Sequence, residues 1–140
     1  MSFGIIVVSG APMELFSRST SRAWTPSDTA MMQFALDHAR SARGRVAPNP
    51  AVGAVVVHDG VVVGVGATQP PPGPHAEVVA LAHAGELARG ADLYVTLEPC
   101  SHHGRTPPCT DAILATGVRR VVAAVGDPHQ LVDGRGFERL

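Results

Sequence analysis

The stretch from residue 74 to residue 109 limits most strongly what this chain can fold into. It contains His75 and Glu77, two residues apart, and the only two cysteines among the 140 residues, Cys100 and Cys109. One imidazole and two thiolates are good ligands for Zn²⁺. Three protein ligands leave the fourth tetrahedral position open, which distinguishes a catalytic zinc site from a structural one. The fold therefore has to bring the histidine and both cysteines together, with Glu77 as a base beside the metal.

The same residues are compatible with two simpler roles. A Cys100–Cys109 disulfide is one alternative for the two cysteines. A closed structural zinc site, with His102 or His103 as its fourth ligand, is another. The complete set of residues in this order favours a zinc hydrolase, because a closed site would leave Glu77 without a task.

Charge and hydropathy exclude several classes of partner. The eleven cationic side chains are all arginine and face twelve carboxylates, so the net charge is −1. This balance gives no general attraction to nucleic acid. No apolar run is long enough to span a bilayer, so no membrane partner is expected. Two cysteines and no clear export signal favour a reducing, cytoplasmic location.

The chain reads as one domain, residues 25–140, preceded by a poorly ordered extension, residues 1–24. Thr25, Pro26 and Asp28 mark a helix start as N-cap, first helical residue and third helical residue, and the helix should end near residue 43. The further elements are expected as strands at 51–57 and 61–67 with a turn between them, a helix at 75–83, a strand at 91–97, a helix at 107–115, a strand at 120–125 and a helix within 131–140.

This order of elements predicts an α/β fold with a mixed sheet covered by helices on both faces, a three-layer α/β/α arrangement. In the helix at 75–83, Val78, Val79 and either Leu81 or Ala82 are expected to face the core. His75 and Glu77 fall in the first turn of that helix, and Cys109 falls at the start of the next one. Helix N-termini favour negative charge and lower the pKa of thiols, which helps to form the thiolates that zinc needs.

The spacing of the cysteines points to a family. A His-x-Glu followed by Pro-Cys and a second cysteine is the pattern of zinc nucleobase deaminases. Most of these have two residues between the cysteines, whereas eight lie there in this chain. In that loop the chain closely resembles the deaminase domains of the bifunctional pyrimidine deaminase/reductases of riboflavin biosynthesis. The matching segments are residues 47–50, 52–55, 74–77, 97–112, 127–128 and 134–136.

The resemblance implies a cytidine-deaminase-like fold and an activity. The substrate would be the phosphorylated pyrimidine 2,5-diamino-6-(5-phosphoribosylamino)pyrimidin-4(3H)-one. Hydrolysis of its C2 amino group would give 5-amino-6-(5-phosphoribosylamino)uracil and ammonia. By similarity His75, Cys100 and Cys109 bind Zn²⁺, and Glu77 shuttles protons.

Substrate contacts are expected at five positions. Asn49 would bind the base or the ribose. His102, Arg105 and Thr106 lie between the two cysteines, where a guanidinium would grip phosphate oxygens well; a solvated loop is the alternative. Asp127, at the end of a strand, would contact the substrate or cap the following turn.

The family pattern also sets expectations where this chain departs from it. Thr68-Gln69 and His129-Gln130 replace residues that the family commonly uses near the substrate. The family's deaminase domain continues past the position of Leu140 and into an NADPH-dependent reductase domain. We therefore expect a fold truncated at its C-terminus, with residues 120–125 as an unpaired edge strand and reductase activity on a missing domain or a separate chain.

Two further hypotheses stay open at this point, together with the state of association. The chain is a homo-oligomer, a dimer or higher, if it behaves as this fold usually does. If the chain shares only the deamination reaction with the family it resembles, its substrate would be a cytosine- or guanine-type base or nucleoside. It is a non-catalytic, zinc-stabilised binding module if Glu77 has no role.

Overall fold

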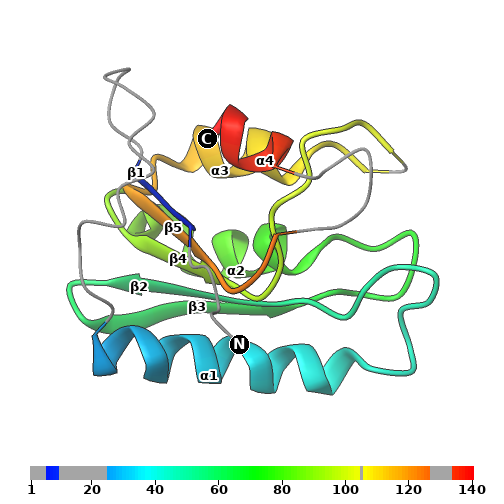
Figure 1. Cartoon of the computed structure of the whole chain (residues 1–140), viewed down its shortest axis with the longest axis horizontal. Coiled ribbons are helices and arrows are strands. Elements are labelled where there is room, and N and C mark those ends of the chain that lie inside the picture. The colour runs from blue at the N-terminus through cyan, green and yellow to red at the C-terminus, as the bar shows by residue number, and fades with distance from the viewer. Residues whose placement is uncertain (1–5, 10–24, 105, 127–133) are drawn as a thin grey trace.

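A computed structural model describes residues 6–9, 25–104, 106–126 and 134–140 (Figure 1). Its centre is a five-stranded mixed sheet with the strand order β1-β5-β4-β2-β3. The elements in chain order are β1 (Ile6–Ser9), α1 (Pro26–Ala42), β2 (Gly53–His58), β3 (Val61–Ala67), α2 (Ala76–Ala84), the short 3₁₀ helix η1 (Gly85–Ala88), β4 (Asp92–Val95), α3 (Cys109–Thr116), β5 (Arg120–Ala123) and α4 (Arg135–Arg139).

Helix α1 begins where the sequence predicts. The Thr25 hydroxyl accepts a hydrogen bond from the Asp28 backbone N–H at 3.1 Å. The Asp28 carboxylate accepts one from the Thr25 N–H at 3.1 Å, which completes a capping box. The helix ends at Ala42, and the polar residues that follow lead into the loop that carries Asn49.

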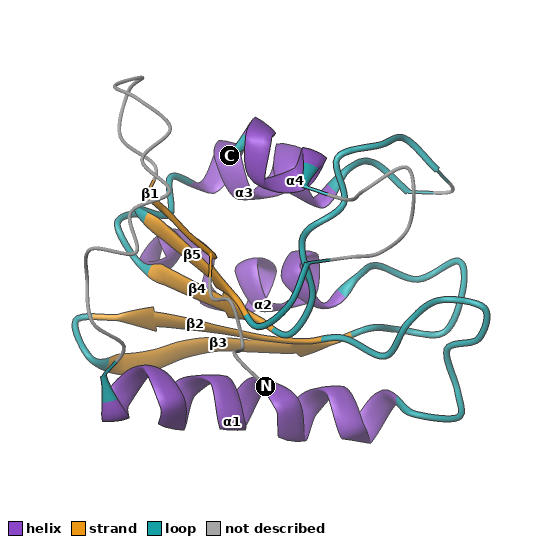
Figure 2. Cartoon of the chain, in the orientation of Figure 1, coloured by secondary structure: helices purple, strands orange, loops and turns teal. Residues whose placement is uncertain are grey.

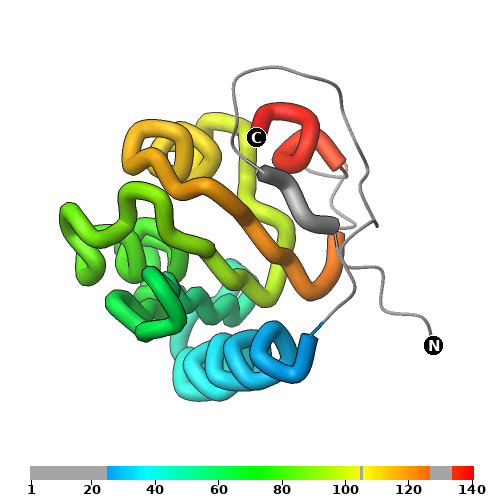
Figure 3. Tube along the Cα trace, turned by 90° about the vertical axis from the view of Figure 1, so that its left-hand side faces the viewer, coloured from blue at the N-terminus to red at the C-terminus, as the bar shows by residue number. Residues whose placement is uncertain are grey.

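The sheet is covered on both faces, which confirms the predicted three-layer arrangement (Figure 2). Along β2, Val55 and Val57 pack on the side of α1, whereas Ala54 and Val56 pack on the side of α2 and α3. This alternation follows from the two-residue period of a strand, and the burial of both faces explains the nearly unbroken apolar run. Figure 3 shows α1 on one side of the sheet and α3 and α4 on the other.

Helix α2 lies unusually close to β3, and this corrects one prediction. Its buried positions are mostly small, with Ala76, Ala80 and Ala84 spaced four residues apart, while Val78 and Val79 are only half-buried. The facing strand offers glycines. A Cβ at Gly64 would lie 2.3 Å from the Ala80 carbonyl oxygen, and one at Gly66 would lie 2.4 Å from that of Ala76. The alanines and the facing glycines let the two backbones approach closely. The alanines fill this interface, and Val78 and Val79 stay only half-buried.

The strand at 120–125 is not an edge, contrary to the prediction. β5 pairs in parallel with β4 on one side and antiparallel with β1 on the other. β1 lies within the segment for which the sequence predicts no regular element, and its backbone supplies the hydrogen-bonding groups that β5 would otherwise leave open. The edges of the sheet are β1 and β3. None of the helices in the described part of the chain combines the length and the apolar character needed to cross a membrane.

A buried polar network joins the start of α1 to the sheet. The Tyr94 hydroxyl donates to Asp28 Oδ1 at 2.6 Å, and Arg120 Nη2 lies 3.0 Å from the same oxygen. Arg120 also lies 2.9 Å from the Asp92 carboxylate. Burial acts to raise the pKa of Asp28, but the hydrogen bonds from Tyr94, Thr25 and Arg120 outweigh it and lower the pKa from 3.8 to about 2.

We expect this network to make stability depend on pH in acid. The folded pKa of Asp28 lies below the unfolded value of 3.8, so its contribution is complete above that pH and is lost as the pH falls toward 2. The lost free energy of unfolding is about 2 kcal/mol. Asp28→Asn should remove this dependence in urea unfolding measured from pH 5 to pH 2. Asp37→Asn, an exposed change on the same helix, should retain it; equal slopes for both variants would contradict the assignment.

Candidate metal centre and active-site cavity

Three elements deliver the predicted metal ligands to one end of the sheet. His75 is the N-cap residue of α2, Cys100 follows β4, and Cys109 is the first residue of α3. The two cysteine segments are tied together locally. The Cys109 N–H donates to Cys100 Sγ at 3.4 Å, and the Thr110 N–H donates to the Cys100 carbonyl at 3.2 Å. Ligands separated by 34 residues in sequence therefore meet beyond the carboxyl end of β4.

The three donor atoms are close enough to share one ion. His75 Nδ1 lies 3.2 Å from Cys109 Sγ and 3.7 Å from Cys100 Sγ. All three atoms lie within 4.8 Å of one another, and among the described residues they form the group able to hold a metal. Because both cysteines are free thiols, the disulfide alternative is wrong. His102 and His103 are described and do not belong to the group, so the closed four-ligand site is wrong as well.

Glu77 lies beside this group, in the first turn of α2, and is only 4% exposed. Burial and, to a smaller extent, the nearby Cys100 thiolate together raise the pKa of its carboxyl to about 7, against the opposing effects of backbone hydrogen bonding, His75 and Cys109. A carboxyl with a pKa near neutrality can both take up and release a proton at physiological pH. This is the property that the predicted proton shuttle needs.

The two thiols have opposite acid–base character in the protein alone. The hydrogen bond from Cys109 and then that from His75 lower the pKa of Cys100 to about 4, although burial opposes them. The same contact with Cys100 and burial raise the pKa of Cys109, while the hydrogen bond to Cys100 raises that of His75. The pair thus shares a proton, and metal loading, which needs both thiolates and a neutral imidazole, has to release protons.

The donor set fits Zn²⁺. Two soft thiolates and one imidazole select zinc over magnesium or calcium, which prefer oxygen ligands. Cys109 is buried and Cys100 is partly exposed, so the group opens toward one side. Three protein ligands with an accessible side form the arrangement of a catalytic zinc centre.

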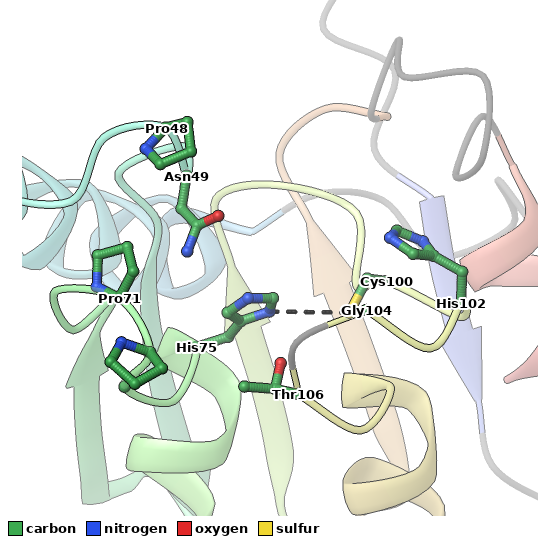
Figure 4. A pocket seen from close by; sticks show the side chains of 10 residues that line it. Pro48, Asn49, Pro71, His75, Cys100, His102, Gly104 and Thr106 are labelled. Atoms are coloured by element: carbon green, nitrogen blue, oxygen red, sulfur yellow. Dashed lines mark hydrogen bonds between the residues drawn. The ribbon is translucent and has the colours of Figure 1, made fainter.

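A cavity of about 250 Å³ opens onto His75 and Cys100 (Figure 4). Three of the predicted substrate-binding residues, Asn49, His102 and Thr106, line it. The other two, Arg105 and Asp127, lie outside the described residues. In Figure 4 the Asn49 amide extends from the loop that carries Pro48 toward the His75 ring.

Sequence reasoning missed the wall formed by the proline-rich loop. Pro71, Pro72 and Gly73 line the cavity, although the sequence predicts only an irregular segment there. The only signal was their position directly before the His75 segment. Thr68, a departure from the family pattern, has a structural role: its hydroxyl donates to the Pro50 carbonyl at 3.1 Å and accepts from the Val52 N–H at 2.9 Å.

Comparison with known proteins agrees with this geometry. Residues 25–125 match the family described as "Cytidine and deoxycytidylate deaminase zinc-binding region". The chain belongs to this family. The match includes all three metal-binding residues and Glu77, so the deaminase family and the donor set both indicate Zn²⁺.

Within this deaminase family the chain is similar to RibD proteins. It is 58% identical to the riboflavin biosynthesis protein RibD of Escherichia coli over 113 residues, which cover 81% of this chain and 31% of that protein. The structure of Acinetobacter baumannii RibD matches with a TM-score of 0.79 at 47% identity, covering 81% of this chain and 32% of that one.

A second similar solved structure is described by its enzymatic activities. It is the diaminohydroxyphosphoribosylaminopyrimidine deaminase/5-amino-6-(5-phosphoribosylamino)uracil reductase of Thermotoga maritima, with a TM-score of 0.73 and 47% identity over 79% of this chain and 32% of that one. The chain therefore spans about a third of the length of the relatives it matches. The shared part is a deaminase domain with the cytidine-deaminase-like fold.

We expect Cys109→Ser to abolish stable zinc binding in this deaminase domain. A hydroxyl at this position is a far weaker zinc ligand than a thiolate, and two protein ligands do not hold the ion. Elemental analysis after dialysis should give zinc near one equivalent for the wild type and near zero for the variant. His102→Ala should keep its zinc, because His102 is not in the donor group; loss of zinc from it instead would contradict the assigned ligands.

Proposed function

We propose that this chain catalyses the hydrolytic deamination of 2,5-diamino-6-(5-phosphoribosylamino)pyrimidin-4(3H)-one. The products would be 5-amino-6-(5-phosphoribosylamino)uracil and ammonia, in riboflavin biosynthesis. The observation that supports this most directly is the buried carboxyl of Glu77 beside three metal-binding atoms, with two of the three metal-binding residues, His75 and Cys100, lining the cavity. The description of the Thermotoga maritima relative supplies the substrate class.

The residues divide the chemistry among them. Zn²⁺ bound by His75, Cys100 and Cys109 would act as a Lewis acid that makes a water molecule nucleophilic near neutral pH. Glu77 would accept a proton from the attacking water and deliver it to a ring nitrogen. The water oxygen would bond to C2 in this first step. Glu77 would then pass the remaining proton of that oxygen to the amino group at C2, so that the C–N bond breaks, a carbonyl forms at C2 and ammonia leaves.

The substrate contacts follow the lining of the cavity. Asn49 offers both an amide N–H and a carbonyl oxygen, so it suits the edge of the base or the ribose. His102 and Thr106 lie on the wall formed by the inter-cysteine loop, where they would contact the phosphoribosyl part together with Arg105. Asp127 stays a proposed contact.

The setting of the enzyme belongs to the same proposal. We place it in the cytoplasm, because two free cysteines and a thiolate metal site suit a reducing compartment. We also propose that it associates into a homo-oligomer and that the reductase step takes place on a further domain or a separate chain. We further propose that the deaminase unit begins at residue 25, after an N-terminal extension, residues 1–24, of which residues 6–9 form β1.

Glu77→Gln should lower kcat by two to four orders of magnitude while zinc stays bound. The amide is nearly the same size but cannot carry the proton. The measurement is steady-state ammonia release together with zinc content. Glu86→Gln is the matched control, because Glu86 is exposed on η1 and its charge lies outside the site. A Glu77→Gln rate within a few fold of the wild type would remove the proton-shuttle role and favour a non-catalytic zinc module.

The choice of substrate is tested by offering several amino-bearing rings. We expect ammonia from the phosphorylated diaminopyrimidinone and none above background from cytidine, cytosine or guanine. The reason is that His102 and Thr106 line the cavity, where we propose that they bind a phosphoribosyl group together with Arg105. The free bases lack this group, and cytidine lacks its phosphate. Release from cytosine or guanine at a comparable kcat/KM would instead identify a deaminase of free bases or nucleosides.

A further inference from the structure

Helix α4 contacts both of the segments that carry the cysteines. Glu98 lies two residues before Cys100, and Asp111 lies two residues after Cys109. Each carboxylate binds α4 or the residues that open it. None of the metal ligands in the described residues comes from this helix, so it can act on the site only through residues next to the ligands.

The connection through Glu98 is buried. This side chain is 3% exposed, and its carboxylate accepts three backbone N–H groups at the start of α4. Oε2 accepts from Gly134 at 3.0 Å, and Oε1 accepts from Gly136 at 3.0 Å and from Phe137 at 3.4 Å. The first N–H groups of a helix have no partner within the helix, and hydrogen bonds to a carboxylate are stronger than neutral ones.

The backbone of α4 also presses directly on the peptide that leads to Cys100. A Cβ at Gly136 would lie 2.0 Å from the Pro99 carbonyl oxygen and 3.1 Å from Glu98 Cγ, so only glycine allows this approach. Phe137 is buried in the same core cluster as Ile113 of α3. The helix is thus held against both the Cys100 segment and the helix that Cys109 opens.

A second connection lies at the surface. Arg139 donates to Asp111 Oδ1 through Nη2 at 2.7 Å and through Nε at 3.1 Å. Asp111 lies in the first turn of α3, which begins at Cys109. An exposed ion pair contributes little to overall stability. The two hydrogen bonds to one oxygen nevertheless fix the orientation of the Arg139 side chain relative to Asp111.

We propose that α4 is a clamp that sets the distance between Cys100 and Cys109 for metal binding, and that Glu98 is its principal positioning residue. We define the α4 clamp as the contacts of Glu98 with residues 134, 136 and 137 and the Asp111–Arg139 pair. The clamp acts on the zinc centre alone. Its test needs no substrate, so failure of the proposed reaction and failure of the clamp are distinguishable.

The first experiment is Glu98→Gln in the full chain, with Glu138→Gln as the matched control. The glutamine amide would present N–H groups to the backbone N–H donors of α4, whereas Glu138 is exposed on the same helix. Outer contacts of metal ligands typically change metal affinity by roughly 10- to 100-fold. We expect a loss of that size for Zn²⁺ in chelator competition, and altered visible absorption bands of the Co²⁺-substituted protein. Gly136→Ala should give the same result.

The second experiment uses the wild type only and does not depend on a variant folding. If α4 supports the metal site, metal binding must in turn stabilise α4 by the same coupling free energy. Zn²⁺ should therefore slow amide hydrogen exchange at Gly134, Gly136 and Phe137 beyond the slowing of the α1 amides, which report global unfolding.

Either experiment can overturn the clamp. A folded Glu98→Gln protein with wild-type Zn²⁺ affinity and an unchanged Co²⁺ spectrum would show that Glu98 only anchors α4. Exchange at Gly134, Gly136 and Phe137 that is slowed by Zn²⁺ no more than in α1 would show that the helix and the metal centre are uncoupled. Equal losses for Glu98→Gln and Glu138→Gln would attribute the effect to net charge.

Discussion

The meeting of one imidazole and two sulfurs beyond the carboxyl end of β4 is the constraint that governs how the whole domain is built. The three atoms come from the starts of two helices and from the loop after a strand. They lie within 4.8 Å of one another only if α2 and α3 are both correctly seated on the sheet. An error of one turn in either helix would move its ligand by about 5 Å, more than this spacing allows.

The packing of the sheet serves that requirement. Alanines of α2 against Gly64 and Gly66 of β3 bring two backbones together with no flexible side chain between them. His75 and Glu77 lie at the end of this contact, so their position follows from backbone geometry. On the opposite face, the Asp28–Tyr94–Arg120 network fixes α1, and the chain leaving α1 leads to Asn49 on the cavity wall. Site and scaffold are therefore parts of one packing arrangement.

The sequence predicted the metal ligands because their types, order and spacing carry the chemistry directly. The capping box of α1 was equally predictable, since all of its atoms come from residues 25–28. The features that the sequence could not predict depend on contacts between residues far apart in the chain. Glu98 accepts a hydrogen bond from Gly134, 36 residues later in the chain. β5 pairs with β1, which is formed by residues 6–9. The wrong expectation for Val78 and Val79 arose because hydrophobicity alone does not reveal the glycines on the facing strand.

Zinc K-edge X-ray absorption of the purified, metal-loaded protein reports the ligand set of the metal centre itself. We expect two sulfur neighbours at about 2.3 Å and one imidazole nitrogen at about 2.0 Å, with a single light atom completing four-coordination. Removing Glu77 by substitution should leave these shells unchanged, because it is not a ligand. A spectrum with one sulfur, or with two imidazoles, would contradict the metal centre described here and the chemistry derived from it.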